Sequence, residues 1–401
     1  MSDSITPSQR EMRALVHDRD LVICVGSGGV GKTTTAASIG IQAAMDGRRV
    51  VVVTIDPAKR LANSLGLEAL GNEEKEIPAS KFAEFGAECR GSLHAMMLDT
   101  QKTFDELISR VSPDDASRDR VLSNNIYKHI SDTLSASHDY MASEKLYDLH
   151  HCGKYDLVVL DTPPMKNAID FLEASGKLTR FLDDTIISWF LKPHDGGKRR
   201  GMSLLQAPGA IVYKLLGSVF GNDFLDEIAE FFVATKDLLA GFRERAEAVS
   251  QLLRNDRKTR FVVVCTPRST SMEEARYFHR QLVERRMPGG LFIVNQVGRY
   301  GEIERGPRGR YLGDADRSWL KTRLEASASS QELAAFVEKL ESHFDRAVAL
   351  ASDDRRAIEG LRSFAGRNCT VAEVPQLPDE VYDFDGLLAI DRHLFGDREQ
   401  P

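Results

Sequence analysis

A glycine-rich stretch near the N-terminus has the residue types and the spacing of a phosphate-binding loop. Residues 26–33 read Gly-Ser-Gly-Gly-Val-Gly-Lys-Thr, which fits the pattern G-x-x-x-x-G-K-[ST]. Glycines allow tight turns and leave bare backbone N–H groups free to face phosphate oxygens. The residues expected to bind a nucleotide here are Gly26, Ser27, Gly28, Gly29, Val30, Gly31, Lys32, Thr33 and Thr34.

The last two residues of the pattern carry a positive charge and a metal ligand. We expect Lys32 to stabilise the β- and γ-phosphates and the hydroxyl of Thr33 to ligate Mg²⁺. A helix beginning near Lys32 would add the positive end of its dipole. The opposing interpretation, a glycine-rich turn with an accidental lysine, conflicts with the flanking sequence. A strand-like apolar run at 21–25 precedes the loop, and a small, apolar, helix-like run at 34–44 follows it.

Two aspartates come directly after strand-like runs and are candidates for catalysis and metal binding. Asp56 follows the β-branched run 49–55 and should lie near the γ-phosphate, because ligands bind at the carboxyl edge of parallel strands. It could orient or deprotonate the attacking water, or cap a helix that starts at Pro57, and the two roles are compatible. Asp161 follows the apolar run 157–160 and is expected to hold Mg²⁺ through water.

Composition and charge narrow the class of protein. The chain has 401 residues, of which 42% are hydrophobic and 28% charged, and its formal net charge is −7. These values are ordinary for globular proteins, and no basic run is longer than 198–200, so no nucleic acid is expected as a partner. The N-terminal residues do not resemble a signal peptide, and no run of about 18 apolar residues occurs. We therefore expect a cytoplasmic protein.

The five cysteines are scattered along the chain without a C-x-x-C pair. Unpaired cysteines of this kind are typical of buried small side chains in a reducing compartment. His150-His151-Cys152 is an isolated cluster of metal-ligand types, for which a surface loop is the better interpretation. No zinc site is expected.

A sheet is needed to position these candidate residues. Apolar, largely β-branched runs typical of buried strands occur at 21–25, 49–55, 93–98, 156–161, 260–265 and 291–293. Helical patterns separate these runs, which predicts an α/β fold with a doubly wound, mostly parallel sheet of the P-loop NTPase kind. We expect a single domain, 1–401, with a helical subdomain formed by insertions at about 99–150 and 173–255.

Several short motifs together form a recognisable set, namely residues 28–34, Thr54-Ile55-Asp56-Pro57-Ala58, Asp161-Thr162-Pro163-Pro164, Phe171-Leu172, Val294-Asn295-Gln296 and Val374-Pro375-Gln376-Leu377-Pro378. The set resembles the ArsA family of arsenite-pump ATPases and its relatives that deliver tail-anchored membrane proteins. The resemblance implies an ATPase that uses ATP and Mg²⁺, with Asp56 as the residue that positions water. It also implies that Asn295 and a proline-rich loop at Pro375 bind adenine.

One departure from the family pattern concerns the partner. The family usually has a signature lysine at the position of Ser27, and this lysine crosses a dimer interface to the partner's phosphates. The resemblance implies a dimer with nucleotide at its interface. Because serine has no positive charge, we predict a heterodimer in which a lysine-bearing paralogue supplies it. Otherwise another cation, such as Lys59, Arg60 or Lys166, takes over this role.

Apolar residues at helical spacing between residues 181 and 242 leave two interpretations open. The stripes could bury one another in a helical subdomain, or they could line a groove for a hydrophobic or membrane-protein client, as in the tail-anchor relatives. Two other function classes also remain. One is a binding module that ATP locks without hydrolysis. The other is a metalloid-pump subunit, which would need paired thiols that the sequence lacks.

Overall fold

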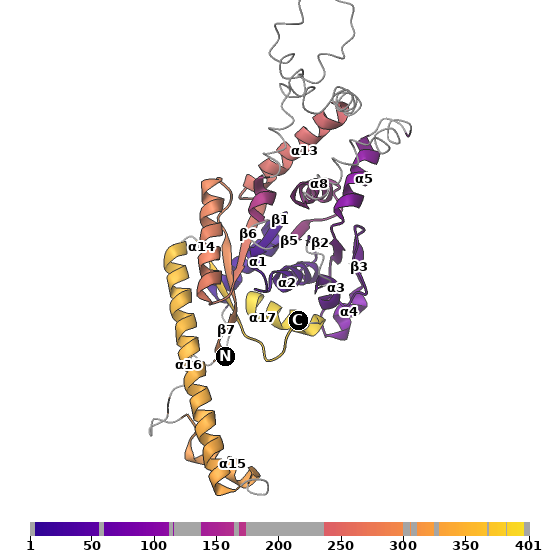
Figure 1. Ribbon diagram of the computed structural model, residues 1–401. Helices are drawn as coiled ribbons and strands as arrows, with labels where there is room; N and C mark the ends of the chain where they lie inside the picture. Colours follow the sequence, from indigo (N-terminus) through magenta and orange to yellow (C-terminus); the bar gives the residue numbers. More distant parts are fainter. Residues whose placement is uncertain are drawn as a thin grey trace, which may run out of the picture.

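The computed structural model describes residues 5–55, 60–111, 115, 138–163, 168–173, 236–299, 305, 311–324, 329–366, 369–381 and 383–396. These residues form one eight-stranded sheet with helices packed on both faces (Figure 1). The strands are β1 (Leu21–Gly26), β2 (Arg49–Thr54), β3 (Lys75–Ile77), β4 (Ser92–Met97), β5 (Leu157–Asp161), β6 (Thr259–Cys265), β7 (Leu291–Val297) and β8 (Val371–Pro375).

The strand order across the sheet is β3-β4-β2-β5-β1-β6-β7-β8. Every neighbouring pair is parallel except β3 and β4, which run antiparallel at one edge. The chain winds from β1 toward one edge of the sheet and later, from β6, toward the other. The point where the winding reverses is beside β1, where a doubly wound sheet opens its ligand crevice. The predicted fold class is thus confirmed.

Alternating side chains of the central strands face two separate cores, as the pleat of a strand requires. In β1, for example, Leu21 and Ile23 belong to one core and Val22 and Cys24 to the other. The helices divide accordingly. One face is covered by α1 (Pro7–Asp18), α2 (Lys32–Met45), α3 (Arg60–Ser64), α4 (Ala79–Glu84) and α17 (Phe384–Phe395). The other is covered by α5 (Thr100–Val111), α8 (His138–His151), α13 (Lys236–Arg254), α14 (Ser269–Glu284) and α16 (Ser330–Ala365).

The predicted helical insertions are described only in part. The first contributes α5 and α8, and the second contributes α13. These three helices pack against one another on the same face of the sheet (Figure 1). Residues 112–114, 116–137 and 174–235 lie outside the described residues, and most of the apolar stripes predicted at 181–242 fall there.

His150 and His151 belong to the last turn of α8, so the expectation of a loop holds only for Cys152, which follows the helix.

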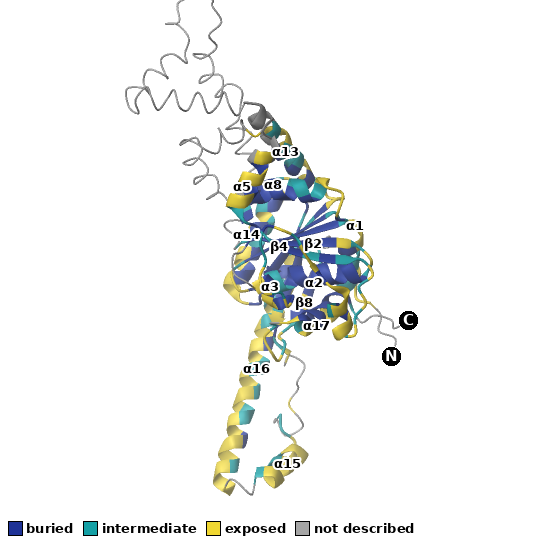
Figure 2. Cartoon of the chain, turned by 90° about the vertical axis from the view of Figure 1, so that its right-hand side faces the viewer, coloured by how far each residue is buried: buried dark blue, intermediate teal, exposed yellow. Residues whose placement is uncertain are grey.

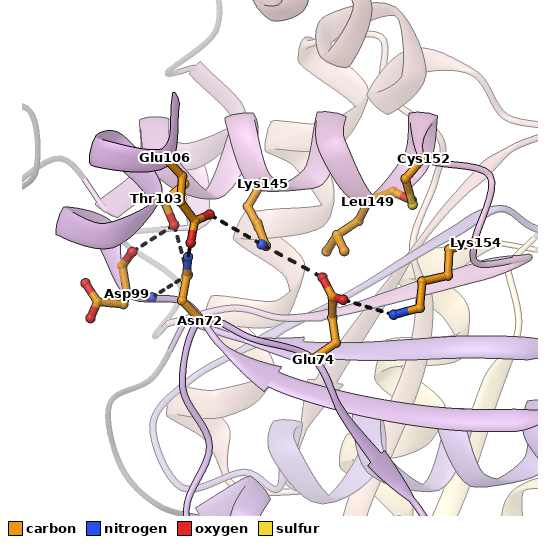
Figure 3. A network of polar contacts seen from close by, with 9 residues as sticks. All are labelled: Asn72, Glu74, Asp99, Thr103, Glu106, Lys145, Leu149, Cys152 and Lys154. Carbon is orange, nitrogen blue, oxygen red and sulfur yellow. Dashed lines mark hydrogen bonds and ion pairs between the residues drawn. The ribbon is translucent and has the colours of Figure 1, made fainter. Parts of the chain in front are cut away.

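A network of polar side chains fastens α5 and α8 to the sheet near β3 and β4 (Figure 3). The amide of Asn72 donates to Glu106 at 3.0 Å, and its oxygen accepts from the hydroxyl of Thr103 at 2.9 Å. Lys145 of α8 lies between Glu106 and Glu74, with its Nζ atom 3.9 Å from a carboxylate oxygen of each. The two helices are therefore tied to the same polar cluster.

A helical arm between β7 and β8 was not predicted in this form. Apolar residues at helical spacing run from Leu333 to Leu350 in the sequence, whereas α16 continues to Ala365 and has 36 residues, or about 54 Å at 1.5 Å per residue. One end of α16 packs beside α14, and the other projects from the body with α15 (Asp314–Leu324) beside it (Figure 1). Figure 2 shows this outer part as largely exposed. The described residues contain no helix long and apolar enough to cross a membrane.

Candidate functional site

A pocket of about 960 Å³ lies beside the phosphate-binding loop. Because β1, β7 and β8 are parallel, the loop after β1, the end of β7 and the segment after β8 lie at the same edge of the sheet. The residues that line the pocket are Gly28, Gly29, Gly31, Lys32, Thr33, Thr34, Arg60, Asn63, Ser64, Asn295, Gln296, Pro375, Gln376, Leu377, Pro378, Asp379, Glu380, Val381 and Ile390. Segments separated by some 350 residues in the sequence thus share one cavity.

Two glycines of the loop are required by the backbone itself. Gly31 has φ 94°, in the left-handed region that favours glycine, and a Cβ atom there would lie 2.3 Å from Nδ2 of Asn295. A Cβ atom on Gly26 would lie 2.2 Å from the carbonyl oxygen of Val264 in the neighbouring strand β6. A larger residue at Gly26 would push the loop away from β6, and one at Gly31 would strain the backbone and displace the side chain of Asn295.

The side chains of Lys32 and Ser27 are held within this unit. The ammonium group of Lys32 donates to the carbonyl oxygen of Ser27 at 2.9 Å. The hydroxyl of Ser27 donates to a carboxylate oxygen of Glu274 on α14. The ammonium group is thus placed inside the curve of the loop, where the sequence motif predicts that it meets a phosphate.

Asp161 collects two hydroxyl groups at the end of β5. Its Oδ2 atom accepts from the hydroxyl of Thr33 at 2.7 Å and from that of Thr54 at 2.9 Å, and the residue is fully buried. The next residue, Thr162, donates its hydroxyl to the carbonyl oxygen of Cys24 in β1 at 2.8 Å. Hydroxyl and carboxylate oxygens are the ligands that Mg²⁺ prefers, so the chemistry of this donor set fits the predicted metal.

A bulge at the end of β7 directs Asn295 onto the phosphate-binding loop. The register between β7 and β8 shifts between Val294 and Val297, and Gln296 has φ 60°, an uncommon value for a residue other than glycine. The side-chain amide of Asn295 donates to the carbonyl oxygen of Val30 at 2.9 Å, while its oxygen accepts from the backbone N–H of Gln296 at 2.9 Å. Asn295 therefore bridges the loop and the outer part of the pocket.

Two buried cysteines lie in the strands beside the loop. Cys24 lies at the centre of the sheet, and burial, followed by the nearby charge of Asp161, raises the pKa of its thiol well above its ordinary value of 9.0. Cys265 at the end of β6 is also buried, which raises its thiol pKa to about 12. Both thiols stay protonated at neutral pH and are poor nucleophiles and metal ligands.

The structure brings most, but not all, of the predicted residues together. Among the predicted residues, Gly26, Ser27 and Val30 belong to the loop but do not line the pocket, and Asp161 lies behind Thr33. Pro375 is the last residue of β8 and does line the pocket, at the start of the predicted proline-rich loop. Asp56 lies outside the described residues, so its predicted role stays a prediction.

Some contacts could not be found by motif. Thr54 is the first residue of the motif around Asp56, but the motif does not indicate that its hydroxyl group contacts the carboxylate of Asp161. Glu274 comes from the second turn of a helix far along the chain, and nothing in the local sequence marks it. Gln296 and Val381 line the pocket only because of the bulge in β7 and the course of the segment after β8.

Comparison with known proteins identifies the family. Residues 19–304 match the model of the ArsA_ATPase family, described as anion-transporting ATPase. Similar curated proteins include ATPase GET3 of Podospora anserina, which is 23% identical over 297 residues, or 74% of this chain and 78% of that protein. ATPase get3 of Schizosaccharomyces pombe is 23% identical over 272 residues, or 68% of this chain and 71% of that protein.

The matched region contains the phosphate-binding loop, Asp161, Asn295 and the seven strands from β1 to β7. It covers most of the chain and ends before the α15–α16 arm. The chain therefore belongs to the ArsA ATPase family and is a P-loop enzyme that hydrolyses ATP.

Proposed function

We propose that the pocket beside β1 binds Mg·ATP, with the phosphates on residues 26–34 and the adenine between Asn295 and the segment 375–381. The observation that carries this proposal is the lining of the pocket itself. A phosphate-binding loop forms one part of it, and the other is formed by a side-chain amide and a proline-rich segment with apolar Leu377 and Val381. Such a site suits a ligand with a charged end and a flat, partly apolar end.

Each residue of the proposed site has a separate role in binding or hydrolysis. Lys32 exchanges the carbonyl oxygen of Ser27 for phosphate oxygens, and loop N–H groups bind the same phosphates. Thr33 holds Mg²⁺ directly and Asp161 holds it through water. Bound Mg²⁺ supplies positive charge that offsets the charge of the phosphates in the transition state. Asp56 positions the attacking water.

The proposal includes a conformational cycle in a cytoplasmic dimer. Arg60 and Ser64 of α3 line the nucleotide pocket, and Asn72, eight residues after Ser64, joins the network that fastens α5 and α8. A change at the phosphates could therefore move α5 and α8, the helices of the first insertion. The family resemblance supports a hydrophobic client for those helices. Because Ser27 replaces the signature lysine, the proposed dimer is a heterodimer with a lysine-bearing paralogue.

Phosphate release by the purified chain, measured with and without Mg²⁺, tests the catalytic part. We expect Mg²⁺-dependent turnover that Asp56→Asn lowers by at least roughly tenfold, as for loss of a residue that orients or deprotonates water. Binding of Mg·ATP with only slow turnover, which Asp56→Asn leaves unchanged, would instead favour a module that ATP locks without hydrolysis. Stimulation by arsenite would revive the metalloid-pump interpretation.

Light scattering of the chain, alone and mixed with candidate paralogues, tests the assembly. A heterodimer predicts a chain that gains mass and turnover only with a lysine-bearing partner. A fully active homodimer of the isolated chain would contradict it. In that case a cation of this chain replaces the signature lysine.

A further inference from the structure

The short helix α3 presents one of its faces to the nucleotide pocket. Arg60, Asn63 and Ser64 line the pocket, and they are spaced i, i+3 and i+4, so they lie on the same side of a helix. The opposite side is fixed in the core, where Leu61 and Leu65 are 0% and 1% exposed. This anchoring holds Arg60 at the wall of the pocket.

The guanidinium group of Arg60 is available to a ligand. Among the described residues, no hydrogen bond or ion pair holds it, although two carboxylates, Asp379 and Glu380, line the same pocket. Several other arginines near the sheet are held by carboxylates of the protein. Arg49, for example, forms an ion pair with Asp156 at 2.6 Å. Arg60 and Lys32 are the two cationic residues among those that line the pocket, and only Lys32 is tied to the loop.

The charge of the phosphates exceeds what the loop alone supplies. Ser27 offers a hydroxyl group that is already donated to Glu274, which brings a negative charge next to the loop. A guanidinium group has a planar fork of N–H donors that matches two phosphate oxygens at once. Arg60 has the charge and the donor geometry that Ser27 lacks.

We propose that Arg60 is a second phosphate-binding residue of this site, which adds a positive charge from this chain to that of Lys32. The proposal rests on the proposed function, because it requires that the pocket binds ATP. It specifies a contact to phosphate oxygens rather than to the base. The loss on removing Arg60 should therefore grow with the number of phosphates.

Calorimetric titration of the full chain with ATP, ADP and AMP, all with Mg²⁺, tests this assignment. Arg60→Ala should weaken ATP binding by roughly tenfold or more, as expected for loss of a charge-assisted contact, and should weaken AMP binding much less. Arg60→Lys should recover part of the loss, because it restores the charge without the fork. Arg10→Ala is the matched control, since Arg10 is an exposed arginine on α1 that does not line the pocket.

The outcomes separate the two proposals. Wild-type affinity of Arg60→Ala for ATP would overturn the role of Arg60 while leaving the proposed function in place. An equal loss for ATP and AMP would also overturn it, because it would indicate a contact to the base or a shift of α3. A wild-type chain that does not bind Mg·ATP at all would overturn the proposed function and this inference together. Thermal unfolding of each variant verifies that the fold is retained.

Discussion

At the scale of single residues, Thr33 and Thr54 provide a test of which hydroxyl serves the nucleotide. Both donate to the same oxygen of Asp161, yet only Thr33 lines the pocket. We predict that Thr33→Val raises the Mg²⁺ concentration needed for half-maximal turnover at least roughly tenfold, because a hard-cation ligand is lost. Titration of turnover with Mg²⁺ measures this effect.

Thr54→Val is the control for that substitution. It removes a hydroxyl group from a buried site, so we expect a loss of about 1–2 kcal/mol in the free energy of unfolding. Its requirement for Mg²⁺ should change little. Equal shifts in the Mg²⁺ requirement of the two variants would contradict the assignment of Thr33 as the direct ligand.

The ion pair of Arg49 and Asp156 gives a prediction for pH. The hydrogen bond from the Arg49 side chain is the largest cause that lowers the pKa of Asp156 below its ordinary value of 3.8. An acid with a lowered pKa stabilises the fold above its unfolded-state pKa, and this contribution is lost as the pH falls through the folded-state pKa. The relevant window is therefore below about pH 4.

Urea unfolding of Asp156→Asn and of the wild type at several pH values measures this contribution. Both side chains are partly exposed, so we expect a difference of less than about 1 kcal/mol near neutral pH. The difference should shrink as the pH falls below about 4. A difference that grows toward low pH would contradict the assigned sign.

Residue chemistry was the most predictable level of this protein. The motif alone pointed to Lys32 and Thr33, which line the pocket, because the chemistry of phosphate binding dictates residue type and spacing over a few positions. The contact between Asn295 and the carbonyl oxygen of Val30 spans 265 residues and depends on strand order and on a bulge. A resemblance could suggest the role of Asn295, but local sequence could not place it.

At the scale of elements, the polar network at Asn72 is a structural joint. Asn72 is 4% exposed and contacts Glu106, Thr103 and the backbone N–H of Asp99. We predict that Asn72→Ala lowers the free energy of unfolding by about 1–3 kcal/mol, because it leaves buried polar partners without their hydrogen bonds. Urea denaturation measures the change.

Gln101→Ala is the matched control, since Gln101 is an exposed amide at the start of α5. Its effect should stay within about 0.5 kcal/mol. If Asn72→Ala is as mild as the control, the network does not fasten α5 to the sheet. The coupling proposed between the pocket and the helical insertions would then lose its physical path.

The strands were predictable where a continuous apolar run fills them, as in residues 50–53 of β2, which are all valine. Edge strand β3 has three residues, of which only Ile77 is buried, so it carries no periodic signal. Helix α3 is similarly short and begins directly after residues that lie outside the described chain. Short elements with few buried side chains leave too little pattern to identify.

At the scale of the whole molecule, the protein divides into a packed body and a projecting arm. Helix α16 belongs to both, because Leu361 is 0% exposed in the core whereas Leu350 is 64% exposed. Helix α15, at the outer end of the arm, has no buried residue. The apolar stripe that would have revealed one 36-residue helix is therefore interrupted, which is why its full length was not predicted from sequence.

The same helix provides a matched pair of substitutions. We predict that Leu361→Ala lowers the free energy of unfolding by about 2–5 kcal/mol, as for other large-to-small changes in a core. Leu350→Ala should change it by less than about 0.5 kcal/mol. Urea denaturation measures both changes. Comparable losses in the two variants would mean that Leu350 is packed against another part of the same chain and would contradict its exposure.

The central claim is that one pocket holds ATP, with its phosphates on residues 26–34 and its base near Asn295 and residues 375–381. Photolabelling of the full chain with an azido-adenine analogue of ATP, followed by mass spectrometry of the labelled peptides, tests it directly. We predict labelling of peptides that contain Asn295–Gln296 or Gln376–Val381, lost on competition with ATP and in Lys32→Ala. Labelling confined to peptides outside the pocket, or labelling that Lys32→Ala leaves unchanged, would contradict the account.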